Sequence, residues 1–154
     1  MLKAKDIMKR EVITVSPATH VTEAARILLE NHINGLPVVD EDGTLVGIIC
    51  QSDLVAQQKR LPVPSFFNLL DGLIPMASPR SLEKEVRKIV AITVVEAMSN
   101  NPVTVTPETG LEEIATLMVS KNFHTLPVLE NAKLVGVVGK EDVLRTLIVQ
   151  GVGH

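Results

Sequence analysis

The sequence predicts an α/β fold made of two tandem β-α-β-β-α units that pack with pseudo-twofold symmetry, with a helical insert between them. One observation is an internal repeat: Thr14 recurs 90 residues later as Thr104, and Leu36-Pro37-Val38 recurs at the same offset as Leu126-Pro127-Val128. The other is that each copy places one helix-period pattern between short β-branched runs. The first unit is expected at 1–58, the insert at 59–93 and the second unit at 94–154.

Each copy begins with a short β-branched run that ends at a proline, Pro17 in the first copy and Pro107 in the second. Such a run is typical of a short edge strand, because proline cannot donate to a strand ladder. An amphipathic helix is expected next, since apolar residues recur at i, i+3, i+4, i+7 and i+8 from Val21 and again from Leu111.

Two strands joined by a tight turn are expected after this helix. In the first copy they lie between residues 36 and 49, around the turn signal Asp42-Gly43. The second copy has a turn one residue shorter, around Asn131-Ala132. A closing helix is expected from about Ser52 and from about Glu141.

Neither copy is large enough to bury a substantial core by itself, because small domains bury a small fraction of their surface. Two copies packed sheet against sheet would share one core. Pseudo-twofold packing would also create two related clefts between the copies, each able to hold a ligand.

The composition limits the function and the partners. The chain of 154 residues has a formal net charge of -3 and no concentrated basic surface, which argues against nucleic acid as a partner. Its single cysteine, Cys50, excludes a disulfide within the chain and fits a reducing compartment. No signal-peptide pattern and no run of 18 apolar residues occurs, so a cytoplasmic location without membrane contact is expected.

No catalytic set is visible in the sequence. Cys50 has no neighbouring histidine to activate it, and neither a phosphate-binding loop nor a dinucleotide fingerprint occurs. The histidines show no metal-ligand spacing with the cysteine or with one another: His20, His32, His124 and His154. We therefore expect no enzymatic activity, no metal and no required cofactor.

Four stretches carry a resemblance to a known family. They are "IMKREVITVSP", "NGLPVVDEDGTLVGIICQSDL", "AMSNNPVTVTP" and "HTLPVLENAKLVGVVGKEDVL". Both repeats resemble cystathionine-β-synthase (CBS) domains over about 1–58 and 94–149, and the tandem resembles a Bateman module. The resemblance implies a regulatory module that binds an adenosine-containing ligand, such as AMP, ADP, ATP or S-adenosylmethionine. It also implies a homodimer.

In that family each cleft combines the aspartate at the start of one repeat's last helix with the first strand and the Leu-Pro-Val segment of the other repeat. For the first cleft the resemblance implies Ser52, Asp53, Val103, Thr104, His124, Thr125 and Pro127. For the second cleft it implies Ile13, Thr14, Asn34, Gly35, Pro37 and Asp142, with Glu141 beside them.

The sequence departs from the family at the position three places before each aspartate. The usual hydroxyl residue there is replaced by Cys50 and Gly139, which argues against strong polyphosphate binding. We expect the Asp53 cleft to be the better site. It has the neutral hydroxyl of Ser52 where the other cleft has Glu141, whose carboxylate would repel a phosphate.

Each of these residues also has a structural alternative. Asp53 and Asp142 could stabilise a helix N-terminus without any ligand, and Ser52 could cap that helix. His124 could be a packing residue, and Lys140 could be a solvated surface lysine rather than an anion contact. At the level of the whole chain, the alternative is a ligand-free scaffold whose purpose is dimerisation or partner docking.

The insert at 59–93 has no counterpart within the repeat. Six apolar residues occur there at helical spacing: Phe66, Phe67, Leu69, Leu70, Leu73 and Ile74. This face could pack back onto its own module or serve as a docking surface for self-association or for a protein partner. Membrane contact is disfavoured because no basic face accompanies it.

Overall fold

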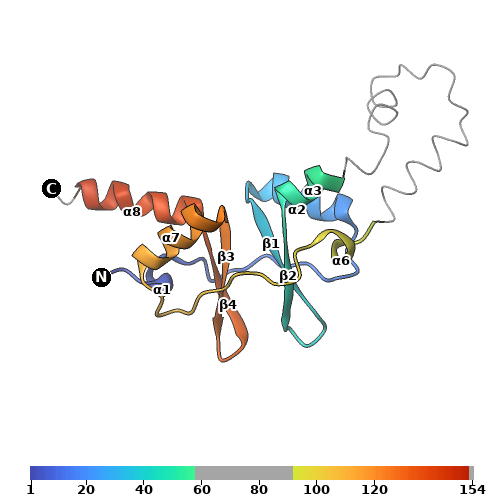
Figure 1. Ribbon diagram of the computed structural model, residues 1–154, viewed down its shortest axis with the longest axis horizontal. Coiled ribbons are helices and arrows are strands. Elements are labelled where there is room, and N and C mark those ends of the chain that lie inside the picture. The colour runs from blue at the N-terminus through green and yellow to red at the C-terminus, as the bar shows by residue number, and fades with distance from the viewer. Residues whose placement is uncertain (58–91, 153–154) are drawn as a thin grey trace, which may run out of the picture.

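The computed structural model describes residues 1–57 and 92–152. Of the insert expected at 59–93, only Ile92 and Thr93 lie within these ranges, so Phe66 and Phe67 fall outside the described residues. Two α/β units lie side by side, with the tips of their hairpins at one side of the molecule and their longer helices toward the other (Figure 1).

The α/β repeat architecture is confirmed. The elements of the first repeat are α2 (Val21–Asn31), β1 (Gly35–Val39), β2 (Leu45–Cys50) and α3 (Gln51–Gln57). Those of the second repeat are α7 (Leu111–Lys121), β3 (Thr125–Glu130), β4 (Lys133–Gly139) and α8 (Lys140–Val152). The apolar patterns predicted the first residue of α2 and of α7 correctly. Each helix begins at the first apolar residue of its pattern, Val21 or Leu111.

The expected first strand of each repeat is shorter than the sequence suggests. Val15 forms one isolated parallel bridge with Val38, and Val105 forms one with Val128. The Val15 amide donates to Pro37 at 3.1 Å, and the Val15 carbonyl accepts from Val39 at 3.0 Å. Pro17 follows two residues later and has no N–H to extend such a ladder. Each hairpin therefore has two strands and two added bridges, the second being Ile48 with Ser99 in the first repeat and Val137 with Lys9 in the second.

Both hairpins are antiparallel and carry an irregularity of register at the same place, after the Leu-Pro-Val segment. The turn of the second hairpin consists of Asn131 and Ala132, with φ values of 53° and 66°. Two successive positive φ angles suit a two-residue hairpin turn, because their twist matches that of the strands. In the first hairpin Gly43, with φ of 80°, supplies the positive angle.

Two short helices exchange places between the repeats, which the sequence did not predict. Helix α1 (Ala4–Ile7) lies on the second repeat, where the Ala4 amide donates to Thr109 O at 2.8 Å. Helix α6 (Val94–Ala97) lies on the first repeat, where the Val94 amide donates to Thr19 O at 2.7 Å. Each repeat is thus completed by the segment that precedes the other one.

The expectation of one core shared between two sheets is wrong for the described residues, which form two aliphatic clusters. The first consists of Val15, Val21, Ala24, Leu28, Leu36, Val38, Ile49 and Val94. The second consists of Ala4, Val105, Ile114, Leu126, Val128 and Val138. Each hairpin packs against its own helix, and the exchanged residue, Val94 or Ala4, is 0% exposed. The exchange, rather than a common core, binds the two halves together.

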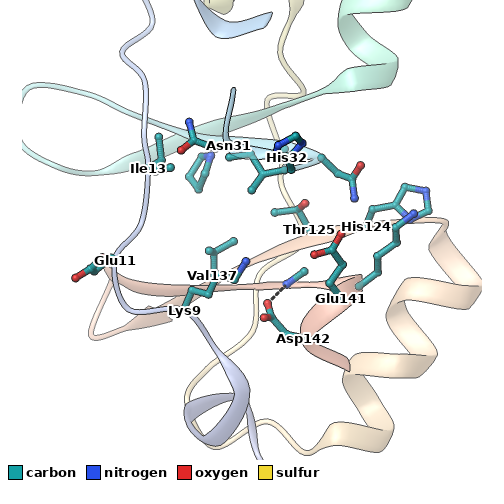
Figure 2. Close-up of a pocket in the computed structure, with 16 residues that line it drawn as sticks. Lys9, Glu11, Ile13, Asn31, His32, His124, Thr125, Val137, Glu141 and Asp142 are labelled. Atoms are coloured by element: carbon teal, nitrogen blue, oxygen red, sulfur yellow. Dashed lines mark hydrogen bonds between the residues drawn. The ribbon is translucent and has the colours of Figure 1, made fainter. Parts of the chain in front are cut away.

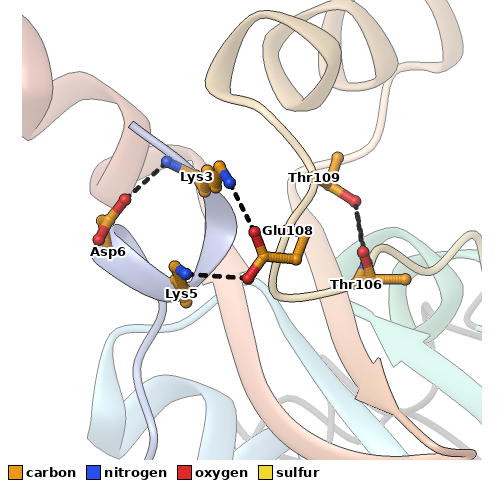
Figure 3. A network of polar contacts seen from close by, with 6 residues as sticks. All are labelled: Lys3, Lys5, Asp6, Thr106, Glu108 and Thr109. Carbon is orange, nitrogen blue, oxygen red and sulfur yellow. Dashed lines mark hydrogen bonds and ion pairs between the residues drawn. The ribbon is translucent and has the colours of Figure 1, made fainter. Parts of the chain in front are cut away.

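Ion pairs accompany the exchange at the surface. Glu108 of the second repeat accepts from the ammonium groups of Lys3 at 2.6 Å and Lys5 at 2.9 Å (Figure 3). The hydrogen bonds from these two lysines lower the pKa of Glu108 to about 2. The pairs are exposed and screened by solvent, so they orient α1 more than they stabilise it.

The exchanged segments also approach the hairpins closely. A Cβ atom on Gly47 would lie 2.5 Å from Met98 Sδ and 2.7 Å from Ser99 O. A Cβ atom on Gly136 would lie 2.5 Å from Met8 Sδ. Only glycine permits this approach, so the two glycines fix where each segment crosses. No helix within residues 1–57 and 92–152 has both the length and the hydropathy to cross a bilayer.

Candidate functional site

The two repeats meet where β1 and β3 begin. A Cβ atom on Gly35 would lie 3.1 Å from Thr125 Oγ1 and 3.1 Å from Cys50 Sγ. Gly35 and Thr125 are equivalent positions of the repeat, 90 residues apart. Their contact therefore joins corresponding positions of the two repeats, and both residues line one of the two cavities described below.

Asp53 lies in the first turn of α3 and is partly exposed. Its Oδ2 atom accepts a hydrogen bond from the Cys50 amide at 2.8 Å, which closes the junction between β2 and α3. Its other oxygen, Oδ1, accepts no hydrogen bond from the described part of the chain. Asp53 therefore does stabilise the start of helix α3, the structural alternative that the sequence left open. It uses only one of its two carboxylate oxygens to do so.

Asp142 occupies the equivalent place in α8 but is 4% exposed. Its Oδ2 accepts from the Gly139 amide at 2.8 Å, and its Oδ1 accepts from Arg145 Nη1 at 2.7 Å. The equivalent of Arg145 in the first repeat is Ala56. Both oxygens of Asp142 are thus engaged, whereas one oxygen of Asp53 accepts no hydrogen bond from residues 1–57 and 92–152.

The cavity beside Asp142 has a volume of about 170 Å³. Five of the residues that the sequence assigned to the second cleft line it: Ile13, Asn34, Gly35, Pro37 and Asp142. Thr14 does not line it. Figure 2 shows Ile13, Asn31 and His32 on one wall, facing Val137, Glu141 and Asp142 on the other.

Sequence reasoning missed Lys9 and Glu11 in the lining of this cavity. The exchange brings them there, because the Lys9 amide donates to Val137 O at 2.9 Å. No local pattern in the sequence indicates this contact. It follows only from the position of α1 on the second repeat.

The cavity beside Asp53 has a volume of about 410 Å³. Of the residues expected in the first cleft, the structure brings together Ser52, Asp53 and His124. The other four do not line this cavity: Val103, Thr104, Thr125 and Pro127. Thr125 lines the Asp142 cavity instead, and Val103 packs against the core of the second repeat. The first cleft therefore contains the larger cavity, and its walls differ from those that the resemblance implied.

Sequence comparison agrees with this geometry. The CBS domain family matches residues 4–60 and, a second time, residues 93–149. The chain belongs to the CBS domain family. It is a tandem CBS pair, or Bateman module, as the resemblance of its repeats indicated.

Similar proteins extend over nearly the whole CBS pair. A CBS domain-containing protein of Dictyostelium discoideum is 34% identical over 145 residues, covering 94% of this chain and 90% of that protein. The crystal structure of CBSX2 in complex with AMP has a TM-score of 0.73 and 27% identity, covering 98% of this chain and 99% of that one. The CBS domain pair of protein MJ0100, in complex with 5′-methylthioadenosine and S-adenosyl-L-methionine, has a TM-score of 0.71 and 27% identity, covering 97% and 98%.

The Asp53 cavity of this CBS pair contains one thiol, that of Cys50. Cys50 lies beside Asp53, and burial together with the Asp53 charge raises the pKa of its thiol to about 11. The thiol is therefore neutral near pH 7 and a poor nucleophile. Among the residues that the structure describes, no group of three His, Cys, Asp or Glu side chains is placed to hold a metal ion.

Proposed function

We propose that this CBS pair is a regulatory module that binds an adenosine-containing ligand in the cleft beside Asp53 and signals by a change of shape or association. The observation that carries the proposal is the Asp53 carboxylate. It is held in place by the Cys50 amide, and Asp53 lines a cavity of about 410 Å³. Two structures similar to this chain, described above, contain AMP or S-adenosylmethionine.

The roles of the residues follow from their chemistry. The free oxygen of Asp53 accepts hydrogen bonds from the ribose hydroxyls, and the Ser52 hydroxyl lies beside the same sugar. His124 and Lys140, which line this cavity, donate to a phosphate. Cys50 stands where a hydroxyl would support a longer phosphate chain, so AMP or ADP suits the cleft better than ATP.

The Asp142 cleft is the weaker site under this proposal. A ribose there has to displace Arg145 from Asp142, and a phosphate has to approach the exposed carboxylate of Glu141. The Asp53 cleft carries neither obstacle. The proposed module holds its ligand without turning it over, because the sequence has no phosphate-binding loop and the Cys50 thiol is neutral.

A thermal-shift screen tests the proposal, because a ligand that binds only the folded state raises the melting temperature. The panel contains AMP, ADP, ATP and S-adenosylmethionine, with cytidine monophosphate as the control that keeps the ribose and phosphate but lacks adenine. We expect a rise with the adenosine-containing ligands and none with the cytidine nucleotide. No rise with any of them at millimolar concentration would contradict the proposal.

A second candidate function, a scaffold for self-association, is favoured by exposed apolar side chains at equivalent places. Leu29 is 71% exposed and its counterpart Val119 is 83% exposed; Val55 and its counterpart Leu144 are exposed too. A surface that repeats itself across a pseudo-twofold axis suits an isologous dimer. A ligand-binding module could also signal through this surface, by a change in its association.

Light scattering at micromolar concentration distinguishes the surfaces that could form the expected homodimer. We expect a dimer that the double substitution Leu29→Ser with Val119→Ser dissociates. The matched variant, Phe66→Ser with Phe67→Ser, alters the insert instead. Loss of the dimer in that variant alone would place the interface on the insert, and a monomeric natural protein would contradict the self-association proposal.

A further inference from the structure

We propose that the two clefts of this CBS pair share a single anion-binding position, formed by Lys140 and His124, so that the chain holds one phosphate-bearing ligand at a time. The inference rests on the proposed function and names how its sites are regulated. The shared position lies in the wall between the two cavities.

The two cavities are lined by three residues in common: Asn34, His124 and Lys140. Asn34 and His124 are equivalent positions of the repeat and immediately precede β1 and β3. They therefore lie where the two hairpins meet, and their side chains belong to the wall that separates the cavities. A group bound against this wall on one side changes the surface available on the other side.

Of the three shared residues, Lys140 is the one that a phosphate group would depend on most, because of the charges that line the two cavities. Among the residues that the structure describes, the lining of the Asp53 cavity has one lysine or arginine, Lys140, and one carboxylate, Asp53. The Asp142 cavity has Lys9 and Lys140 in its lining against three carboxylates, those of Glu11, Glu141 and Asp142, and Arg145 compensates only one of the three, Asp142. When Lys140 is engaged on one side, the other cavity retains an excess of negative charge.

The internal repeat shows that this lysine is unmatched. The counterpart of Lys140 in the first repeat is Gln51. The two backbones are alike, since the Lys140 amide donates to His124 O at 3.0 Å and the Gln51 amide donates to Asn34 O at 3.0 Å. The Gln51 side chain donates to Ile33 O at 3.2 Å and carries no charge. A symmetric module would have two lysines at the wall; this chain has one.

The ammonium group of Lys140 is on a flexible side chain and can turn to either cavity. Its single positive charge cannot neutralise two phosphate groups at the same time. The first phosphate-bearing ligand engages it, and a second phosphate then meets uncompensated carboxylates together with the charge of the first ligand. The second binding step is therefore weakened for an anionic ligand. An uncharged adenosine does not suffer this effect.

Calorimetric titration tests the inference with AMP and adenosine as probes. We expect AMP to saturate near one equivalent per chain, with any second step at least tenfold weaker. Lys140→Met should weaken AMP tenfold or more and change adenosine binding less than threefold. Gln51→Lys, which supplies the missing lysine, should strengthen the second AMP step at least tenfold, whereas Gln51→Met, of similar size but uncharged, should not.

The outcomes separate this inference from the proposed function. Two equal and independent AMP sites in the natural chain would overturn the shared position and leave the proposed function intact. Equal losses of AMP and adenosine binding in Lys140→Met would also overturn it. Failure of both probes to bind the natural chain would overturn the proposed function, and the inference with it.

Discussion

At the scale of single residues, the two aspartates show what the sequence could and could not predict. The repeat and the resemblance locate Asp53 and Asp142 at the start of the closing helices, and both lie there. From Ser52 and Glu141 the sequence predicted unequal ligand affinity of the two clefts, which stays a prediction. The structure adds a difference between the aspartates themselves, the bond from Arg145 to Asp142. The sequence contains that signal, because aligning the repeats sets Arg145 against Ala56. Local patterns alone do not indicate it.

The protonation of Cys50 gives a prediction at the same scale. Because burial raises the thiol pKa to about 11, we expect iodoacetamide to alkylate Cys50 at least tenfold more slowly than free cysteine at pH 8. The rate should rise steeply toward pH 11. An unfolded thiol ionises near pH 9, so the thiol's contribution to folding is complete below pH 9 and is lost as the pH rises through 11.

Mass spectrometry follows this alkylation directly, and the urea-unfolded chain serves as the control. Saturating AMP should slow the reaction further if the ligand occupies the cleft beside Asp53, since Cys50 lines that cavity. A reaction as fast as that of free cysteine at pH 8 would contradict the burial of the thiol.

At the scale of elements, the helix-period patterns and the turn residues of the sequence predicted helices and hairpins that the structure confirms. The i, i+3, i+4 pattern predicted α2 and α7, and the turn residues predicted both hairpins. The first strand, inferred from two β-branched residues before a proline, is one bridge in each repeat. Helices α1 and α6 have four residues each, too few for any helical period to appear in the sequence. Contacts with the other repeat stabilise them together with a local cap, in which the Lys3 amide donates to Asp6 Oδ2 at 2.9 Å and the Thr93 amide donates to Glu96 Oε2 at 2.6 Å.

The turn between β3 and β4 gives a prediction for this scale. Ala132 has φ of 66°, where an L-residue with a Cβ atom is strained and glycine is not. We expect Ala132→Gly to raise the free energy of unfolding by about 1 kcal/mol, measured by urea denaturation.

Ala18→Gly is the matched control for this substitution. Ala18 is exposed and is not among the positive-φ residues, so glycine there should give no stabilisation. Destabilisation by Ala132→Gly as large as that by Ala18→Gly would show that the turn is not strained.

At the scale of the whole molecule, the sequence predicted the duplication but not how the halves are joined. We expected the two repeats to pack sheet against sheet around one common core, because a small unit by itself buries only a small fraction of its surface. The structure satisfies that need by exchange: α1 completes the second repeat and α6 completes the first. The exchange also explains why Lys9 and Glu11 line a cavity for which no local motif predicted them.

This exchange predicts that the repeats fold together. Residues 1–57 and 92–154, produced as separate polypeptides, should each lack a cooperative thermal transition, because each carries the helix that the other needs. Mixed in equal amounts, they should form one folded complex with the circular dichroism spectrum of the intact chain. A cooperative transition in either fragment alone would contradict the structural role of the exchange.

The central claim is that Asp53 holds the ribose of an adenosine-containing ligand, and calorimetry with AMP on two aspartate variants tests it most directly. Asp53→Ala and Asp142→Ala each remove one equivalent backbone contact, to the Cys50 or Gly139 amide, so they control for each other's effect on folding. A hydrogen bond to a carboxylate is worth roughly 1.5–3 kcal/mol, which corresponds to a loss of affinity of about tenfold or more. We predict that Asp53→Ala largely abolishes AMP binding while Asp142→Ala changes it little. The opposite order of effects, or no binding of AMP by the natural chain, would contradict the account.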